Sequence, residues 1–372
     1  MSGSRIVILL LSGASGVGLN VLATLRERRD ALQLVATSSV ADAPGLFDYD
    51  EVYLVPETAD GELIFDQRMN DIFDRTMPDL VIPCRDDDVL WLANKAAQDP
   101  RWAEVALCGS RELAEVMLCK HASAVFCQQR GLPFVATIRL SEPTDSVDRF
   151  IAEHGFPLLL KPATEFASRR VSIATRRSQL ERIGGATDLV AQPFLGDAGE
   201  IERYLAEIEA GGVPLFHSFE GIKTSIQAYI APDGGVCGVF ATRNTMRAGK
   251  SESVHIETDA EVIELGRSSA GVFAELGWRG PLNLQCQRSR DGELKIFELN
   301  GRFTGATSAR YLLGYDEVGL AVRWHALHQL PDVVPGVEAC TAVARLPESC
   351  SIQSKLVEVL RPNGRWVSAN TP

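Results

Sequence analysis

The sequence predicts an α/β protein of two or three domains, and three observations lead to this prediction. The chain has 372 residues, which is more than a single hydrophobic core usually serves. Residues 1–113 alternate short apolar runs with helix-forming stretches, the pattern of a parallel sheet covered by helices. Further along, two runs of alternating polarity flank Asp291-Gly292, a strong signal for an antiparallel hairpin, so the chain is expected to be α+β overall.

Composition and charge exclude several classes of function. With 45% hydrophobic residues and a mean hydropathy of +0.01, the chain has the composition of a soluble globular protein. Its net charge of −12 argues against nucleic-acid and membrane-surface partners, since both need clustered basic residues. No apolar run approaches the roughly 18 residues of a membrane span, and residues 6–11 are too few for a signal peptide. The eight cysteines form no CxxC pair, which favours a reducing, cytoplasmic location.

The first 113 residues are expected to form an open sheet, with strands at residues 6–11, 32–37, 52–55 and 80–83. Between the first strand and a helix at 17–25 lies Gly13-x-x-Gly16-x-Gly18. This order is not that of a dinucleotide fingerprint, and no acidic residue ends the second strand, so we interpret it as a tight turn near a substrate anion. Asp86-Asp87-Asp88 is interpreted as the cap of a helix, with a catalytic acid cluster as the alternative.

The hairpin around Asp291-Gly292 carries a row of oxygen-bearing side chains. If Asp-Gly forms a two-residue turn, Gln285 pairs with Glu298, and Asn283 pairs with Asn300. All four then share one face, while the opposite face is apolar and consists of Leu282, Leu284, Cys286, Phe297 and Leu299. Amide and carboxylate oxygens are ligands that Mg²⁺ prefers. The pattern indicates a magnesium site, or an ordinary half-buried hairpin with a solvated face.

The order Gln285, then Glu298-Leu-Asn300-Gly-Arg302-Phe-Thr-Gly, resembles the C-terminal metal motif of the ATP-grasp superfamily. Within that superfamily it resembles the large-subunit module of carbamoyl phosphate synthetase and its stand-alone relatives, and the match in order and spacing runs from about residue 115 to 330. The resemblance implies ATP with two magnesium ions, for which manganese can substitute. It places Gln285, Glu298 and Asn300 on the metal and Arg302 on the phosphates. Gly301 stands where the family usually has proline.

Two lysines and one loop match the family's phosphate-binding parts. The resemblance makes Lys120, on a helix predicted at 110–131, and Lys161, at the end of an apolar strand, the cations that contact ATP. The flap that covers the phosphates corresponds to residues 163–170 and contains no glycine. Ser168 and Arg169 offer hydroxyl and guanidinium donors there in place of bare amides.

The segment that reads the adenine edge is less clear. Residues 189–195 resemble the family's interdomain strand, which makes Gln192, Phe194 and Leu195 the adenine-binding residues. Residues 214–220 are the second candidate. Arg243, Arg247 and Lys250 are similar to the basic stretch that faces triphosphate or substrate, with a solvated loop as the alternative.

The last part of the chain carries two further patterns. Hydroxyls at residues 304–308 open a helix and are typical of an anion seat, and in relatives this loop lines the acceptor pocket. His325-x-x-His328 lacks a third metal ligand nearby, so a structural role is favoured.

The resemblance implies a Rossmann-like domain at 1–113, followed by a two-subdomain ATP-grasp fold with a small subdomain at 114–192 and a large one at 193–332. Residues 333–372 are expected to close the structure. The implied activity is that of an ATP-dependent carboxylate–amine ligase that works through an acyl phosphate on small-molecule substrates, with Lys161 and Arg302 as catalytic residues. The alternatives are a bicarbonate- or carbamate-phosphorylating enzyme and a non-catalytic ATP-binding subunit. A homodimer is left open.

Overall fold

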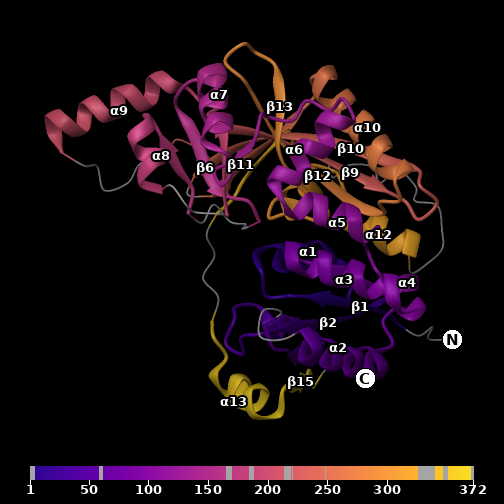
Figure 1. Cartoon of the computed structure of the whole chain (residues 1–372). Helices are drawn as coiled ribbons and strands as arrows, with labels where there is room; N and C mark the ends of the chain where they lie inside the picture. The colour runs from indigo at the N-terminus through magenta and orange to yellow at the C-terminus, as the bar shows by residue number, and fades with distance from the viewer. Residues whose placement is uncertain are drawn as a thin grey trace.

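The computed structural model describes residues 5–57, 62–164, 170–183, 188–212, 219, 221–247, 249–325, 340–346 and 351–369. Within these ranges the strands form three separate sheets, and helices cover their faces (Figure 1). The predicted α/β fold class is confirmed. None of the helices in the described ranges is both long and apolar enough to cross a lipid bilayer.

The first sheet has a core of four parallel strands whose side chains are almost all buried, because helices pack on both faces. An antiparallel strand, β15 (Arg365–Val367), lies at one edge. The strands of this sheet follow the order β15-β3-β2-β1-β4. The predicted strands lie within a residue or so of their expected bounds: β1 (Ile6–Leu11), β2 (Leu32–Ser38), β3 (Glu51–Leu54) and β4 (Leu80–Pro83). Helices α1 (Gly16–Leu25), α2 (Glu62–Thr76), α3 (Asp86–Gln98) and α4 (Pro100–Val105) accompany them.

The glycines after β1 allow a close approach of backbone to backbone. A Cβ on Gly18 would lie 2.3 Å from the carbonyl oxygen of Gly13, a distance that no side chain tolerates. The hydroxyl of Tyr49 donates a hydrogen bond of 2.8 Å to that same oxygen. The turn is therefore tight because of packing, and helix α1 starts immediately after it, with Ser15 as its N-cap.

A small antiparallel sheet follows in the chain, with its strands in the order β5-β8-β6-β7. Helices α7 (Thr144–His154) and α8 (Arg177–Ile183) pack on its apolar face through Phe150, Ile151 and Leu180. The strands are β5 (Ile138–Arg139), β6 (Leu158–Pro162), β7 (Ser172–Ala174) and β8 (Leu189–Pro193).

The large antiparallel sheet has the order β13-β12-β9-β10-β11-β14. Its strands are β9 (Ile222–Ile230), β10 (Val236–Arg247), β11 (Lys250–Glu257), β12 (Gly280–Arg288), β13 (Leu294–Asn300) and β14 (Ala342–Ala344). Helix α10 (Ala260–Glu275) packs on one face together with the helices around residues 111–129, and Phe273, Leu282 and Leu284 share that core. Three further helices are α9 (Ala198–Gly211), α11 (Thr307–Leu312) and α12 (Glu317–His325).

The single helix predicted at residues 110–131 is wrong, because the chain forms two helices there. Helix α5 (Arg111–Leu118) ends at Cys119, whose φ of −103° and ψ of 113° are extended, and α6 (Lys120–Gln129) begins directly afterwards. The amide of Lys120 donates a 2.8 Å hydrogen bond to the carbonyl oxygen of Ala163, beside the small sheet. A tertiary contact thus replaces the helical hydrogen bond, which no local propensity signals.

The C-terminal segment contributes to two sheets. Strand β14 extends the large sheet beside β11, whereas β15 (Arg365–Val367) pairs antiparallel with β3 in the first sheet. Between them, helix α13 (Ser354–Asn363) lies against the first sheet, at the opposite end of the molecule from the large one (Figure 1).

Candidate active site

The hairpin β12–β13 brings the predicted oxygen-bearing side chains together. Gln285 is paired with Glu298, and Asn283 with Asn300, as expected. The two-residue turn behind that expectation is wrong, because Ser289 and Glu293 still pair and the loop comprises residues 290–292. A bulge between Gln285 and Cys286, which leaves one extra residue on β13, compensates for the longer loop. The register at the site is therefore the one that the shorter turn would have produced.

The extra residue is Phe297, and it corrects the predicted division into faces. Leu282, Leu284 and Leu299 lie in the hydrophobic core, as predicted. Phe297, expected beside them, instead lines the same cavity as Gln285 and Glu298, because the bulge turns it away from the core. Its ring centroid lies 5.4 Å from Nζ of Lys161 and 5.5 Å from Nζ of Lys223. Strand β13 thus also supplies an aromatic contact for the two lysines.

A cavity of about 850 Å³, called the central cavity below, contains this site. Helix α1, the large sheet and the loop after β13 form its walls, so a helix that covers the first sheet contributes together with the large sheet. The residues that line it include Asn20, Lys223, Ser225, Asn244, Arg247, Lys250, Glu252, Gln285, Phe297, Glu298, Asn300, Arg302, Thr304 and Arg345. Cationic side chains outnumber acidic ones along this lining, which suits a polyanionic ligand.

The amide of Gln285 is oriented by its neighbours. Its nitrogen donates to Oδ1 of Asn283 over 2.6 Å and to the hydroxyl of Ser225 over 3.3 Å. Asn283 is fully buried and itself donates to Ser225. Both bonds use the amide nitrogen, so Oε1 of Gln285 stays available to the cavity. Within the described residues no group of three or more His, Cys, Asp or Glu side chains could hold a metal. One carboxylate and two amide oxygens fit a magnesium ion that keeps phosphate and water ligands.

Arg302 is held by an acidic residue at the start of helix α3. Its Nη2 donates 2.8 Å to Asp86 and 3.2 Å to Oδ1 of Asn300, while its buried Nε has no partner among the described residues. Burial lowers the pKa of this guanidinium, but the adjacent Asp86 carboxylate leaves it raised overall. Arg302 therefore remains a cation at the cavity wall.

The three consecutive acids before α3 have separate tasks. Asp88 accepts from the amide of Arg85 and caps the helix, so the capping interpretation is confirmed for this residue. Asp87 pairs with Arg85, and Asp86 reaches across to Arg302. Burial raises the pKa of Asp88 to about 7, with Asp87 adding to the effect and a hydrogen bond from Ser12 opposing it.

Lys161 is a buried cation in need of an anion. It leaves the end of β6 and donates a 3.1 Å hydrogen bond to the carbonyl oxygen of Phe297, which joins the small sheet to the large one. Burial lowers its pKa to about 7; the charge of Glu298 opposes this, while Lys120 and Lys223 add to it. The charges of three lysines and one glutamate thus interact at this end of β13. A bound polyphosphate would reduce the repulsion among the lysines. Lys120, the first residue of α6, is buried as well.

Two of the three predicted adenine-binding residues line a second cavity. Phe194 and Leu195 line a space of about 860 Å³ between α6, α7 and the hairpin loop, away from the central cavity. Gln192 is buried and donates 2.9 Å to the hydroxyl of Thr137. Ser168 and most of the second candidate segment, residues 214–220, lie outside the described residues.

The predicted basic stretch lies at the end of β10 and the start of β11, and it divides between two environments. Arg247 and Lys250 line the central cavity, whereas Arg243, on the opposite side of the strand, pairs with Glu257 at 3.1 Å. His325 ends α12, and His328 lies outside the described residues.

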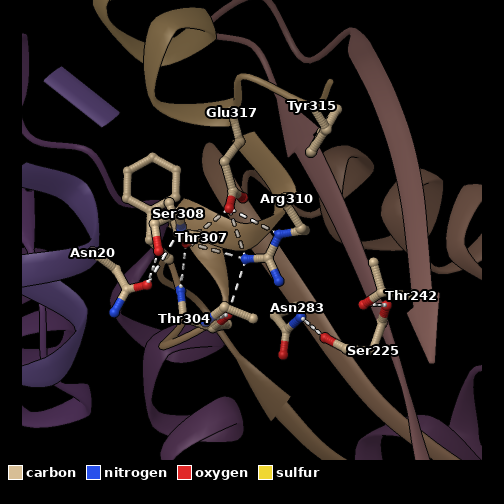
Figure 2. A network of polar contacts seen from close by, with 12 residues as sticks. Asn20, Ser225, Thr242, Asn283, Thr304, Thr307, Ser308, Arg310, Tyr315 and Glu317 are labelled. Atoms are coloured by element: carbon tan, nitrogen blue, oxygen red, sulfur yellow. Dashed lines mark hydrogen bonds and ion pairs between the residues drawn. The ribbon is translucent and has the colours of Figure 1, made fainter. Parts of the chain in front are cut away.

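A buried ion pair beneath the loop at residues 304–308 was not predicted. Arg310 and Glu317 are 0% and 1% exposed, and Nη2 and Nε of the arginine both donate to Oε1 of the glutamate. Nη2 also donates to the hydroxyls of Thr304 and Thr307 (Figure 2). These hydroxyls in turn accept from backbone amides of the loop, so the ion pair fixes its shape. An arginine on a short helix carries no sequence signal for such a role.

Asn20 of helix α1 connects this helix to the loop at residues 304–308. Its side-chain oxygen accepts from the hydroxyl of Ser308 over 2.6 Å and from the amide of that residue over 3.4 Å (Figure 2). Asn20 also lines the central cavity. The helix that follows the glycine turn therefore supports the cavity wall.

Gly301, which stands where the resemblance expects proline, has no room for a side chain. A Cβ at this position would lie 2.4 Å from the indole of Trp278 and 2.7 Å from Met117. Trp278 is fully buried and donates 3.0 Å to the carbonyl oxygen of Pro281. In this chain the tryptophan occupies the space that a proline ring would need.

The small sheet with Lys161, the large sheet with Gln285, Glu298 and Asn300, and the parallel sheet before them make up an ATP-grasp fold. Comparison with protein-family models gives no match, and comparison with curated protein sequences gives none either.

Several solved structures share this fold. The chain is 11% identical to N5-carboxyaminoimidazole synthetase of Staphylococcus aureus in complex with ADP, with a TM-score of 0.65 over 89% of this chain and 80% of that one. The chain is 17% identical to the biotin carboxylase domain of 2-oxoglutarate carboxylase from Hydrogenobacter thermophilus, in complex with MgADP and bicarbonate. The TM-score is 0.62 over 88% of this chain and 71% of that one. It is 14% identical to L-amino acid ligase of Bacillus licheniformis, with a TM-score of 0.61 over 88% of this chain and 75% of that one. At these identities the likeness concerns the fold.

Proposed function

We propose that this protein is an enzyme, an ATP-dependent carboxylate–amine ligase that acts on small molecules in the cytoplasm and releases ADP and phosphate. The observation that carries the proposal is the contact of Lys161 with strand β13, next to Glu298. This buried lysine, its pKa lowered to about 7, contacts Phe297 directly beside Glu298. A cation held in this way needs a polyanion, and the row of oxygen ligands next to it suits the divalent ion that accompanies ATP.

The roles of the residues follow from their positions. Lys120 and Lys161 would bind the phosphates from the side of the small sheet. Gln285, Glu298 and Asn300 would hold magnesium, which offsets charge on the phosphoryl oxygens when it is bound. A substrate carboxylate oxygen attacks the γ-phosphorus, ADP leaves, and an amine then displaces phosphate from the acyl phosphate. Arg302, kept charged by Asp86, faces the developing negative charge, so these residues act by position and electrostatics.

The neighbours in fold support this class of chemistry and also a second candidate. One of them is an L-amino acid ligase, and another is a carboxylase whose structure contains bicarbonate. Together with the likeness of the metal motif to the carbamoyl phosphate synthetase module, the second favours phosphorylation of bicarbonate or carbamate. The two candidates differ in the group that attacks ATP.

Measurement of ADP release tests the proposal. The purified protein is supplied with ATP and Mg²⁺ and with the amino acids singly and in pairs, or with bicarbonate alone. We expect turnover with a pair of amino acids, loss of turnover on chelation, and its recovery with Mg²⁺ or Mn²⁺. Lys161→Met should lower kcat/KM about 100-fold or more. Lys355→Met, which removes an exposed lysine of helix α13 outside both cavities, serves as the matched control and should change little.

Each rival has its own outcome in the same assay. Turnover that needs bicarbonate alone would favour the carbamate candidate. Tight ATP binding without ADP release under any condition would contradict both and favour a non-catalytic ATP-binding subunit.

A further inference from the structure

Arg345 differs in its pairing from the other arginines that line the central cavity. It follows β14, lines the cavity and is partly buried. Its backbone amide donates 2.8 Å to the carbonyl oxygen of Glu252. Among the described residues, however, no side chain forms an ion pair or hydrogen bond with its guanidinium. Burial lowers the pKa of Arg345, and the like charge of Arg310 lowers it further.

The neighbouring arginines each have an anion of their own. Arg302 pairs with Asp86, and Arg247 pairs with Glu252 at 3.4 Å. Arg310 pairs with Glu317, yet its buried Nη1 has no partner among the described residues. Arg310 and Arg345 are close enough for their charges to repel, and of the two only Arg310 has a carboxylate partner, so an excess positive charge remains at this side of the cavity. An anionic group of a ligand would remove both the repulsion and the cost of desolvation.

We propose that Arg345 binds a carboxylate of the substrate that does not react, the α-carboxylate of an amino acid. This inference rests on the proposed ligase function and names the class of its substrate. The planar guanidinium forms two parallel hydrogen bonds with a carboxylate. Among the arginines described at this side of the cavity, one unpaired guanidinium matches a monoanion, whereas a phosphate dianion would leave one charge uncompensated. The loop at Thr304–Ala306, which the buried Arg310 fixes, forms the adjoining wall.

Paired substrates test the proposal without any mutation. ADP release is measured with the amine-donor amino acid that gives the highest turnover and with its carboxamide, in which the charge is absent and the shape is kept, while the carboxylate donor is the same in both reactions. The wild type should prefer the acid by about 10- to 100-fold in kcat/KM, the effect of one charge-assisted bidentate contact. Equal use of the amide would overturn the proposal, while absence of ADP release with every substrate would instead refute the proposed function.

Variants then assign the preference to Arg345. In Arg345→Gln the KM for the amino acid should rise about 10- to 100-fold, while the KM for the amide and for ATP should change less than about threefold. Arg345→Lys, which keeps the charge and loses the bidentate geometry, should fall in between and serves if the glutamine variant does not fold. Arg243→Gln removes an exposed arginine of the same sheet outside the cavity and is the control. An equal loss for acid, amide and ATP would show that Arg345 supports the fold instead.

Discussion

The side-chain nitrogen of Lys161 lies 3.1 Å from the carbonyl oxygen of Phe297 and 5.4 Å from the centroid of its ring. One residue, displaced by a β-bulge, therefore provides both a hydrogen-bond acceptor and an aromatic face for the same buried cation. Lys161 belongs to the small sheet and Phe297 to the large one, so this contact also couples the two elements that would enclose a nucleotide.

Lys161 predicts that ATP binding takes up a proton. Without ligand its pKa is about 7, because burial disfavours the charge. A polyphosphate raises that pKa, so above pH 7 binding should be accompanied by proton uptake, and affinity should fall as the pH rises from 7 to 9. Calorimetry at pH 8 in two buffers with different heats of ionisation measures the uptake. Lys161→Met should abolish it, and an unchanged uptake in that variant would contradict the assignment.

The same pKa has the opposite consequence for the ligand-free protein. Between about pH 7 and the ordinary lysine value of 10.5, the unfolded chain binds a proton that the folded chain does not. The free energy of unfolding contributed by Lys161 should therefore increase with pH in this window. Urea unfolding of the wild type and Lys161→Met at pH 7 and 9 compares the two slopes.

Asp88 should make the protein more stable in mild acid. Its folded pKa of about 7 is above the ordinary value of 3.8, so the folded state binds the extra proton between these values. Stability from this group is fully present below about pH 4 and is lost as the pH rises through 7, by up to about 1.4 kcal/mol per pH unit. Asp88→Asn keeps an acceptor for the helix cap and should remove this slope. Urea unfolding from pH 4 to 8 tests it, and identical slopes in both proteins would sink the prediction.

The Arg310–Glu317 pair should cost more when halved than when removed. Either Arg310→Met or Glu317→Leu leaves a fully buried charge without its partner and should destabilise the protein by about 3–5 kcal/mol. The double variant should recover most of this loss. As a matched control, Arg267→Met breaks an exposed pair with Glu264 and should cost less than about 1 kcal/mol. Additive losses in the double variant, measured by urea unfolding, would show that the two side chains act independently.

Gly301 and Trp278 should behave as a coupled pair. Gly301→Ala places a methyl group against the indole and should destabilise the protein by about 1–3 kcal/mol. In a Trp278→Phe background, where the clashing indole atoms are absent, the same alanine should cost much less. Thermal unfolding of the four proteins in a double-mutant cycle measures the coupling. A cycle without coupling would mean that the departure from proline has another cause.

Much of this architecture could be predicted from local sequence patterns. The continuous apolar runs of β1 and β4 and the alternating runs of β12 and β13 located these strands, because burial on one or two faces leaves a direct mark on composition. The pairing of Gln285 with Glu298 was also correct, although two errors, a turn that was too short and an unpredicted bulge, cancelled each other.

What could not be predicted depends on contacts between distant parts of the chain. The break at Cys119 comes from a hydrogen bond to Ala163, and neither glycine nor proline marks it. The exposure of Phe297 to the central cavity follows from the bulge, which has no signature in the residue types. The burial of Arg310 depends on Glu317 and on the loop around Thr304, so the same letters on a solvated helix would look alike.

The placement of β15 has a consequence for how the protein is made. The first sheet holds strands from the beginning of the chain, yet its edge at β3 is covered only when residues 365–367 arrive. At the usual pace of translation, ~5–20 residues per second, that edge stays open for many seconds while the intervening segments emerge from the ribosome. An open strand edge invites pairing with other chains. Nascent molecules should therefore depend on chaperones until this late strand docks.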